Sequence, residues 1–316
     1  MGQKAPGRSE RDGITLIQLF DRFPNDEVAE QWFIEQRWPE GVRCAHCESE
    51  RVKRNGGHPR MPFHCKDCRK FFSVKTKSTM ESSKVGYRKW AIAIYLMSTN
   101  IKGTASMKLH RDLGVTQKTA WHMAHRIRET WTDDKGMFTG PVEVDETYFG
   151  GKEGNKHAKK KLHAGRGTVG KTAVVGAKDR ETNTVKAEVA PLADGPALRG
   201  FVYKHTKPGA TVYTDSAYEY RGLVGVHHEA VCHSVGEYVR GQATTNGIES
   251  FWALLKRGYY GTYHKFSIWH LHRYVNEFCG RHNVRGLHTA IQMGKVVKGM
   301  VGKRLRYKDL TGPVSD

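Results

Sequence analysis

The chain has 316 residues, with 52 lysines and arginines against 32 aspartates and glutamates, and a formal net charge of +20. The length allows two or three domains, and the charge favours a polyanion such as nucleic acid as the partner over a generically basic role, for example in a ribosome-associated protein. No run of 18 or more apolar residues exists and no apolar signal segment begins the chain, so we expect no membrane partner and a cytoplasmic protein with reduced cysteines.

Residues 1–40 are expected to form an N-terminal arm with two short helices around Pro24, and residues 41–80 a zinc ribbon. The ribbon prediction rests on two CxxC pairs separated by about one β-hairpin of chain. Four thiolates at tetrahedral corners hold a structural Zn²⁺, and each CxxC turn supplies two of them. The predicted zinc ligands are Cys44, Cys47, Cys65 and Cys68.

Residues 81–132 predict three helices that form a helix-turn-helix. Gly114 supplies a tight turn, and Thr116 can cap the third helix. In this motif the last helix enters the major groove with its N-terminal residues leading. Its outward candidates for DNA binding are Gln117, Lys118, His122, His125 and Arg126. An ordinary three-helix bundle is the alternative.

Residues 138–295 alternate strands and helices in an informative order. A strand with Asp145 is followed by two strands, a helix at 195–205, a strand that ends at Asp215, a strand at 230–235 and a helix with Glu249. This order fits the mixed α/β sheet of an RNase H-like domain, in which the first strand is central and pairs with the fourth. Asp145 and Asp215 should then lie side by side, and residues 296–316 remain as a basic tail.

Adjacent carboxylates repel each other unless a divalent cation joins them, and hard oxygen ligands select Mg²⁺ or Mn²⁺. Two such ions can activate a water or a 3′-hydroxyl for phosphodiester chemistry. Glu249 would complete the metal site, and Lys256, two helical turns later on the same face, would contact a substrate phosphate. Glu143 and Glu146 flank Asp145 and are expected on the opposite face of the strand. A basic segment could grip DNA near the site or be a solvated loop; its candidates are Lys159, Lys160, Lys161 and Arg166.

These motifs together resemble the bacterial insertion-sequence transposases of the DDE class, in the subgroup that joins a zinc ribbon and a helix-turn-helix to an RNase H-like catalytic core. The resemblance is carried by both CxxC pairs, Thr119-Ala120-Trp121, Val144-Asp145-Glu146-Thr147-Tyr148-Phe149-Gly150-Gly151-Lys152, Thr214-Asp215, and Asn246-x-x-Glu249 with Lys256. It implies metal-binding roles for Asp145, Asp215 and Glu249, with Lys256 as the accompanying lysine.

The resemblance also implies a nucleoid-associated bacterial enzyme that binds the terminal inverted repeats of an insertion sequence. Such an enzyme cleaves each end and joins the freed 3′-hydroxyl to double-stranded target DNA, acting as a homodimer or larger assembly. Two alternatives remain open from the residues. One is a non-catalytic or domesticated DNA-binding regulator, and the other is a metal-dependent, structure-specific nuclease.

Overall fold

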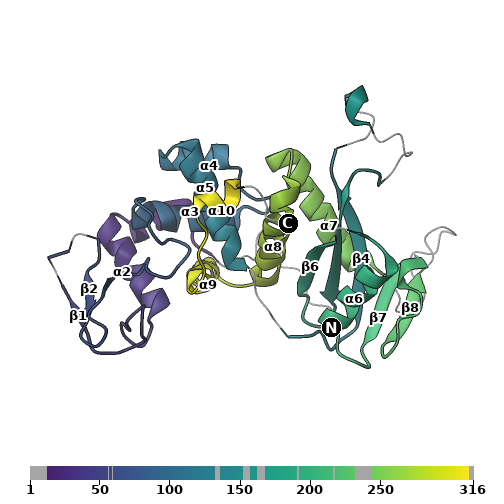
Figure 1. Cartoon of the computed structure of the whole chain (residues 1–316), viewed down its shortest axis with the longest axis horizontal. Coiled ribbons are helices and arrows are strands. Elements are labelled where there is room, and N and C mark those ends of the chain that lie inside the picture. Colours follow the sequence, from purple (N-terminus) through teal and green to yellow (C-terminus); the bar gives the residue numbers. More distant parts are fainter. Residues whose placement is uncertain are drawn as a thin grey trace. The chain divides into compact units, whose positions relative to one another are not determined.

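The computed structural model describes residues 13–55, 57–58, 60–131, 136–151, 157–161, 168–190, 192–215, 218–231 and 244–312 (Figure 1). The chain forms two compact units. Unit 1 comprises Met1–Asp133 together with Val284–Asp316, and unit 2 comprises Asp134–Asn283. No helix within these described ranges is long and apolar enough to cross a membrane.

Unit 1 begins with α1 (Leu16–Arg22) and α2 (Asp26–Arg37), and the side chains of Thr15 and Asn25 cap them. A three-stranded antiparallel sheet follows, formed by β1 (Val52–Arg54), β2 (Phe63–Cys65) and β3 (Phe71–Phe72) in that order. Phe72 is fully buried, because Trp38 packs edge-on against it and Phe63 stacks on it. The predicted helices around Pro24 and the strand-rich cysteine module are therefore both present.

Three helices come next, namely α3 (Tyr87–Thr99), α4 (Ser106–Leu113) and α5 (Gln117–Arg128), and a single 3₁₀ turn at Glu129–Trp131 follows them. Gly114 ends α4 in the left-handed region, at φ 56°, where glycine carries no steric penalty. The Thr116 hydroxyl accepts a hydrogen bond from the Thr119 N–H, so Thr116 caps α5 as predicted.

The C-terminal segment belongs to unit 1, a placement that its sequence pattern does not predict. Its helices are α9 (Thr289–Met300) and α10 (Tyr307–Thr311). Met293, Val296, Val297 and Met300 of α9 are buried in the same core as Trp90. The predicted boundary between a catalytic domain of 138–295 and a basic tail of 296–316 is therefore wrong, because it falls inside α9. The apolar face of α9 is buried against helices of unit 1 that are far away in the sequence.

Unit 2 contains a five-stranded mixed sheet in the order β6-β5-β4-β7-β8. Its strands are β4 (Val142–Phe149), β5 (Thr172–Asp179), β6 (Val185–Ala190), β7 (Thr211–Asp215) and β8 (His227–Val231). β5 is antiparallel to β4 and β6, whereas β7 is parallel to β4 and β8. The first strand is thus central and pairs with the fourth, as the sequence predicts. The last strand begins earlier than the predicted 230–235, and residues 232–235 lie outside the described ranges.

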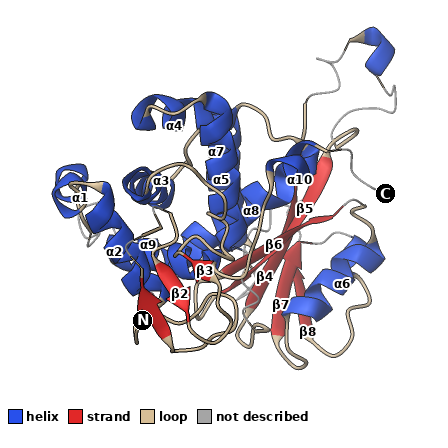
Figure 2. Cartoon of the chain, turned by 60° about the vertical axis from the view of Figure 1, so that its left-hand side comes forward, coloured by secondary structure: helices blue, strands red, loops and turns tan. Residues whose placement is uncertain are grey.

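Helices cover both faces of this sheet (Figure 2). On one face α6 (Gly195–His205) buries Leu198, Phe201 and Val202 against even-numbered residues of β4. On the other face lie α7 (Asn246–Gly258) and α8 (Leu271–Val284), which bury Phe251 and Trp252 with Phe149. Short helical turns at 158–160, 218–220 and 268–270, and a π-helical turn at 259–263, complete the described elements.

Candidate functional site

The four predicted cysteines converge at one point of the ribbon. Their sulfur atoms all lie within 4.8 Å of one another, with Sγ–Sγ distances of 3.6 Å for Cys44–Cys68 and 3.7 Å for Cys47–Cys65. A tetrahedral ion with Zn–S bonds of about 2.3 Å requires sulfurs roughly 3.8 Å apart. The cluster therefore fits a structural Zn²⁺.

Backbone groups of the second CxxC turn already favour a thiolate there. The N–H groups of Cys68 and Asp67 are directed at the Cys65 sulfur and hold its pKa down to about 6, against the opposing effect of burial. Because zinc binds thiolates, the lowered pKa of Cys65 favours zinc binding at this turn.

In unit 2 the strand pairing brings two of the predicted acids together. Val142 and Glu143 of β4 lie opposite Val212 and Tyr213 of β7 in parallel register. The same register, carried two positions along both strands, aligns Asp145 with Asp215. Equivalent positions on neighbouring parallel strands face the same side of the sheet, so both carboxylates project from one face.

Neighbouring carboxylates, with Glu249 among them, disfavour the charge of Asp145. The pKa of Asp145 is raised to about 7, first by burial and then by the negative charges of Glu146, Asp215 and Glu249. Repulsion among carboxylates in a partly desolvated site is the condition that a bound cation relieves. The three acids therefore form a strongly anionic site.

Glu249 lies in the first turn of α7, where the Thr245 hydroxyl donates to its Oε1 at 2.8 Å. The start of α7 is in turn fixed to β4 by Glu143. The Glu143 Oε2 accepts from the Ile248 N–H at 2.8 Å, and its Oε1 accepts from Arg180 Nε at 2.7 Å. Glu143 is only 4% exposed, so this charge-assisted link holds Glu249 over the strand that carries Asp145.

Gly176 and Lys178 of β5 allow α7 to lie close to the sheet. Gly176 lies opposite Asp145 in the register, and a Cβ at this position would be 2.6 Å from the Trp252 ring. Lys178 Nζ also donates to the Gly247 carbonyl at 3.4 Å. Only a residue without a side chain permits this approach, so the position of α7 depends on Gly176.

The placement of Glu143 corrects the sequence analysis, which assigned it to the face opposite Asp145. Residues two apart on a strand share a face, so the alternation itself would have identified Glu143 as a neighbour of Asp145. Glu146 does face the other side, where its Oε2 accepts from the Tyr220 hydroxyl at 2.9 Å. Burial and the charge of Asp215 raise the pKa of Glu146.

The structure describes only some of the basic residues of unit 2 that were predicted to contact DNA. Lys256 is exposed on α7, two turns after Glu249. Lys159 and Lys161 are at least partly exposed beside a short 3₁₀ turn, as expected for a solvated loop or a DNA contact. The side chain of Lys160 and all of Arg166 lie outside the described part of the chain.

In unit 1 only some of the residues predicted to contact DNA are exposed. Gln117 and Lys118 are exposed in the first turn of α5, as predicted. Arg126, by contrast, is buried and donates from Nε to the Leu305 carbonyl at 3.1 Å, and the His122 ring contacts the same oxygen at 3.1 Å. His125 is fully buried. The helical core therefore covers His125, and the C-terminal segment largely covers Arg126 and leaves His122 half-buried.

Comparison with protein families gives two matches. Residues 137–283 match the ISXO2-like transposase domain, and residues 24–71 match the transposase zinc-ribbon domain. The first match coincides with unit 2, and the second spans the cysteine cluster.

Similar individual proteins were also found. A Halobacterium salinarum protein, named an uncharacterized protein in transposable element ISH50, is 30% identical over 248 residues, which cover 74% of this chain and 83% of the relative. Among solved structures, a chain of the simian T-cell lymphotropic virus intasome in complex with PP2A regulatory subunit B56 gamma is 15% identical, with a TM-score of 0.27. That match covers 60% of this chain and 65% of the other, and at this TM-score it supports no conclusion about the fold.

Proposed function

Because the chain belongs to the family of insertion-sequence transposases with an ISXO2-like transposase domain and a zinc ribbon, we propose that it cleaves the ends of an insertion sequence and joins them to target DNA. The observation that carries this proposal is the parallel register of β4 and β7, which aligns Asp145 with Asp215, together with the anchoring to β4 of the helix that bears Glu249. The raised pKa of Asp145 agrees with this arrangement. A DNA-binding regulator has no use for three mutually repelling carboxylates, which destabilise the fold unless a cation neutralises them.

The chemistry of the acids favours Mg²⁺ or Mn²⁺, since carboxylate oxygens are hard ligands. Among the described residues, only the cysteine cluster has all its ligand atoms within 4.8 Å, so the three acids are spread more widely than ligands of a single ion. A pair of ions would divide the three acids between two positions. Such ions would supply Lewis acidity at the attacking and leaving oxygens.

The remaining residues of the site have supporting roles in this proposal. Lys256, exposed on the same helix as Glu249, would bind a phosphate of the DNA strand being cut. Glu143 and Gly176 would hold α7 so that Glu249 stays over the two aspartates. We further infer an RNase H-like fold for unit 2, supported by its strand order with β4 central and β7 parallel to it.

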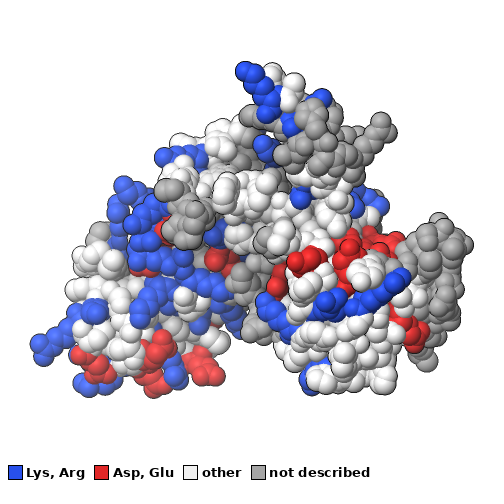
Figure 3. All heavy atoms as spheres, turned by 45° about the vertical axis from the view of Figure 1, so that its right-hand side comes forward, with Lys and Arg blue, Asp and Glu red and all other residues white. Residues whose placement is uncertain are grey.

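The DNA ends would be bound by unit 1. Its ribbon and the helices α3 to α5, in helix-turn-helix order, support this role, together with the net charge of +20. In the space-filling view, Lys and Arg side chains form a broad band across the visible face of unit 1, with Asp and Glu gathered at its lower edge (Figure 3). A further group of Asp and Glu side chains gathers on unit 2. Two ends must be joined in one event, so a dimer or larger assembly on DNA is expected.

The test is strand transfer by the zinc-loaded protein with Mg²⁺ or Mn²⁺. Duplexes that carry the DNA ends flanking the gene would be mixed with a target plasmid, and joined products would be sequenced. Asp215→Asn should bind the ends but yield no joined product. Joining by Asp215→Asn would refute the active site, cleavage without joining would favour a nuclease, and binding without either by the wild type would favour a regulator.

A further inference from the structure

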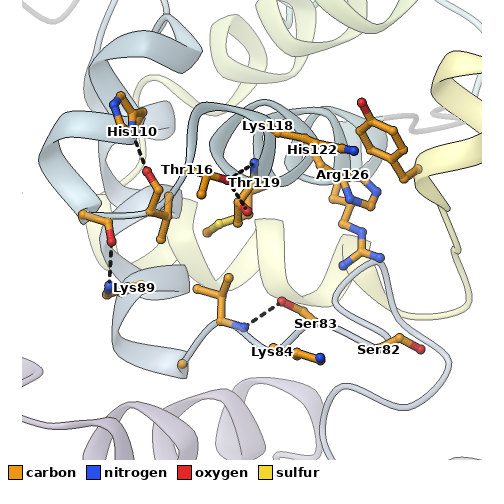
Figure 4. Close-up of a pocket in the computed structure, with 16 residues that line it drawn as sticks. Ser82, Ser83, Lys84, Lys89, His110, Thr116, Lys118, Thr119, His122 and Arg126 are labelled. Carbon is orange, nitrogen blue, oxygen red and sulfur yellow. Dashed lines mark hydrogen bonds between the residues drawn. The ribbon is translucent and has the colours of Figure 1, made fainter.

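A cavity of about 1090 Å³ lies in unit 1 beside the N-terminal half of α5. Its walls come from residues 82–89, the turn between α4 and α5, α5 itself and Tyr307 of α10 (Figure 4). This volume lies at the upper end of the range of about 300–1,000 Å³ that is usual for ligand pockets. The cavity is large enough to accept a segment of a polymer.

The charged residues of the lining are all basic. It contains no aspartate or glutamate, and its cations are Lys84, Lys89, Lys118 and Arg126. The three lysines are exposed, and no ion pair joins any of them to a carboxylate of the described residues. Their positive charge is therefore available to a ligand, and it favours an anionic one.

Hydroxyl groups accompany these charges. Ser82, Thr116 and Thr119 line the same space, with Ser82 and the lysine Lys84 on the side opposite α5 (Figure 4). Lysine, serine and threonine side chains supply most contacts that proteins make with DNA phosphates, together with arginine and backbone N–H groups. The lining thus has the donor set of a phosphate-binding surface.

The C-terminal wall of the cavity is firmly attached to α5. Tyr307 packs edge-on against Trp121 and His122, with ring centroids 6.1 and 5.6 Å apart, and Lys118 Nζ lies 4.3 Å from the Tyr307 ring centre. Leu305 is buried, and its carbonyl accepts from Arg126. The cavity is therefore formed before a ligand binds, and Arg126 and His122 serve to hold its wall.

We propose that this cavity binds the sugar–phosphate backbone of DNA, with Lys84, Lys89 and Lys118 on its phosphates. The proposal rests on the proposed action of the protein on DNA, and it adds where the strand is held. Lysine ammonium groups are point charges that recognise phosphate without reading sequence. They would fix the duplex beside the exposed first turn of α5, which carries Gln117.

The test compares two triple variants of the zinc-loaded, full-length protein. Lys84→Ala/Lys89→Ala/Lys118→Ala removes the cavity lysines. Lys207→Ala/Lys295→Ala/Lys298→Ala removes the same charge from exposed positions that lie outside the cavity, the ribbon and helices α3 to α5. Binding to an element-end duplex and to an unrelated duplex would be followed by fluorescence anisotropy from 50 to 300 mM salt, after thermal melting has shown that both variants are folded.

We expect the cavity variant to bind both duplexes more weakly. The negative slope of log affinity against log salt should become shallower by about 2.7, or about 0.9 for each phosphate that the variant no longer neutralises. The control variant should retain a slope close to that of the wild type. Equal behaviour of the two variants would overturn the proposal, as would a poly-glutamate chain that competes for the cavity as strongly as DNA of equal charge. If the wild type binds no DNA, the proposed function itself fails. If the wild type binds DNA and the two variants behave alike, the assignment of the cavity alone fails.

Discussion

Replacing Asp145 with asparagine should stabilise the protein when no divalent cation occupies unit 2. The pKa of Asp145 rises from an ordinary value of 3.8 to about 7 because burial and neighbouring carboxylates disfavour its charge. One pKa unit corresponds to about 1.36 kcal/mol, so the ionised carboxylate destabilises the folded state by up to about 4 kcal/mol. Asparagine has a similar shape and carries no charge.

The sign of the pH effect follows from the raised pKa. Between about pH 4 and pH 7 the folded chain holds a proton on Asp145 that the unfolded chain has lost. The contribution of Asp145 to stability is therefore fully present below about pH 4, and it is lost as the pH rises through 7. Above pH 7, Asp145→Asn should exceed the wild type in stability by up to about 4 kcal/mol, and near pH 4 the two should be nearly equal.

The measurement is calorimetric unfolding of both proteins at pH 4 and pH 8, in buffer that retains zinc and contains no Mg²⁺ or Mn²⁺. For a unit of this size the difference at pH 8 corresponds to roughly 10 °C in the melting transition of unit 2. Addition of Mg²⁺ at pH 8 should raise the melting temperature of the wild type and leave that of the variant almost unchanged. The reasoning is refuted if Asp145→Asn melts at or below the wild-type temperature at pH 8.

Three further predictions concern the supports of the two sites. Cys65→Ser should lose zinc and unfold the ribbon, which weakens DNA binding but leaves the melting transition of unit 2 unchanged. A variant that binds DNA normally would show that the ribbon does not contribute to binding. Glu143→Ala should lower the stability of unit 2 by about 3–5 kcal/mol in urea unfolding and abolish strand transfer, because it leaves Arg180 and the start of α7 without their carboxylate; an unchanged midpoint would contradict the anchoring role. Gly176→Ala should reduce strand transfer by displacing Trp252, whereas Gly200→Ala, which has open space around it, should not; equal activities would show that α7 tolerates the shift.

The features that the sequence predicted well are local or periodic. The CxxC spacing predicts the four-sulfur cluster, since each turn brings its own two thiolates together within four residues. Thr116, two residues after Gly114, predicts the junction of α4 and α5, because capping and left-handed turns depend on the residues at the junction itself. The order of strands and helices likewise limits a five-stranded sheet to few arrangements, and it led to the pairing of the strands that carry Asp145 and Asp215.

Only the tertiary structure decided which distant segments share a surface. The apolar face of α9 fits either unit by its pattern, and its burial against α3 places the C-terminal segment in unit 1. That segment then covers His122 and Arg126, which the helical period alone predicts to face solvent. Glu143 becomes an anchor because Arg180 and the N-terminus of α7, some 37 and 105 residues away in the chain, come to it. Burial and long-range electrostatics depend on such contacts, so neither the covered helix face nor the pKa of Asp145 can be obtained from spacing along the chain.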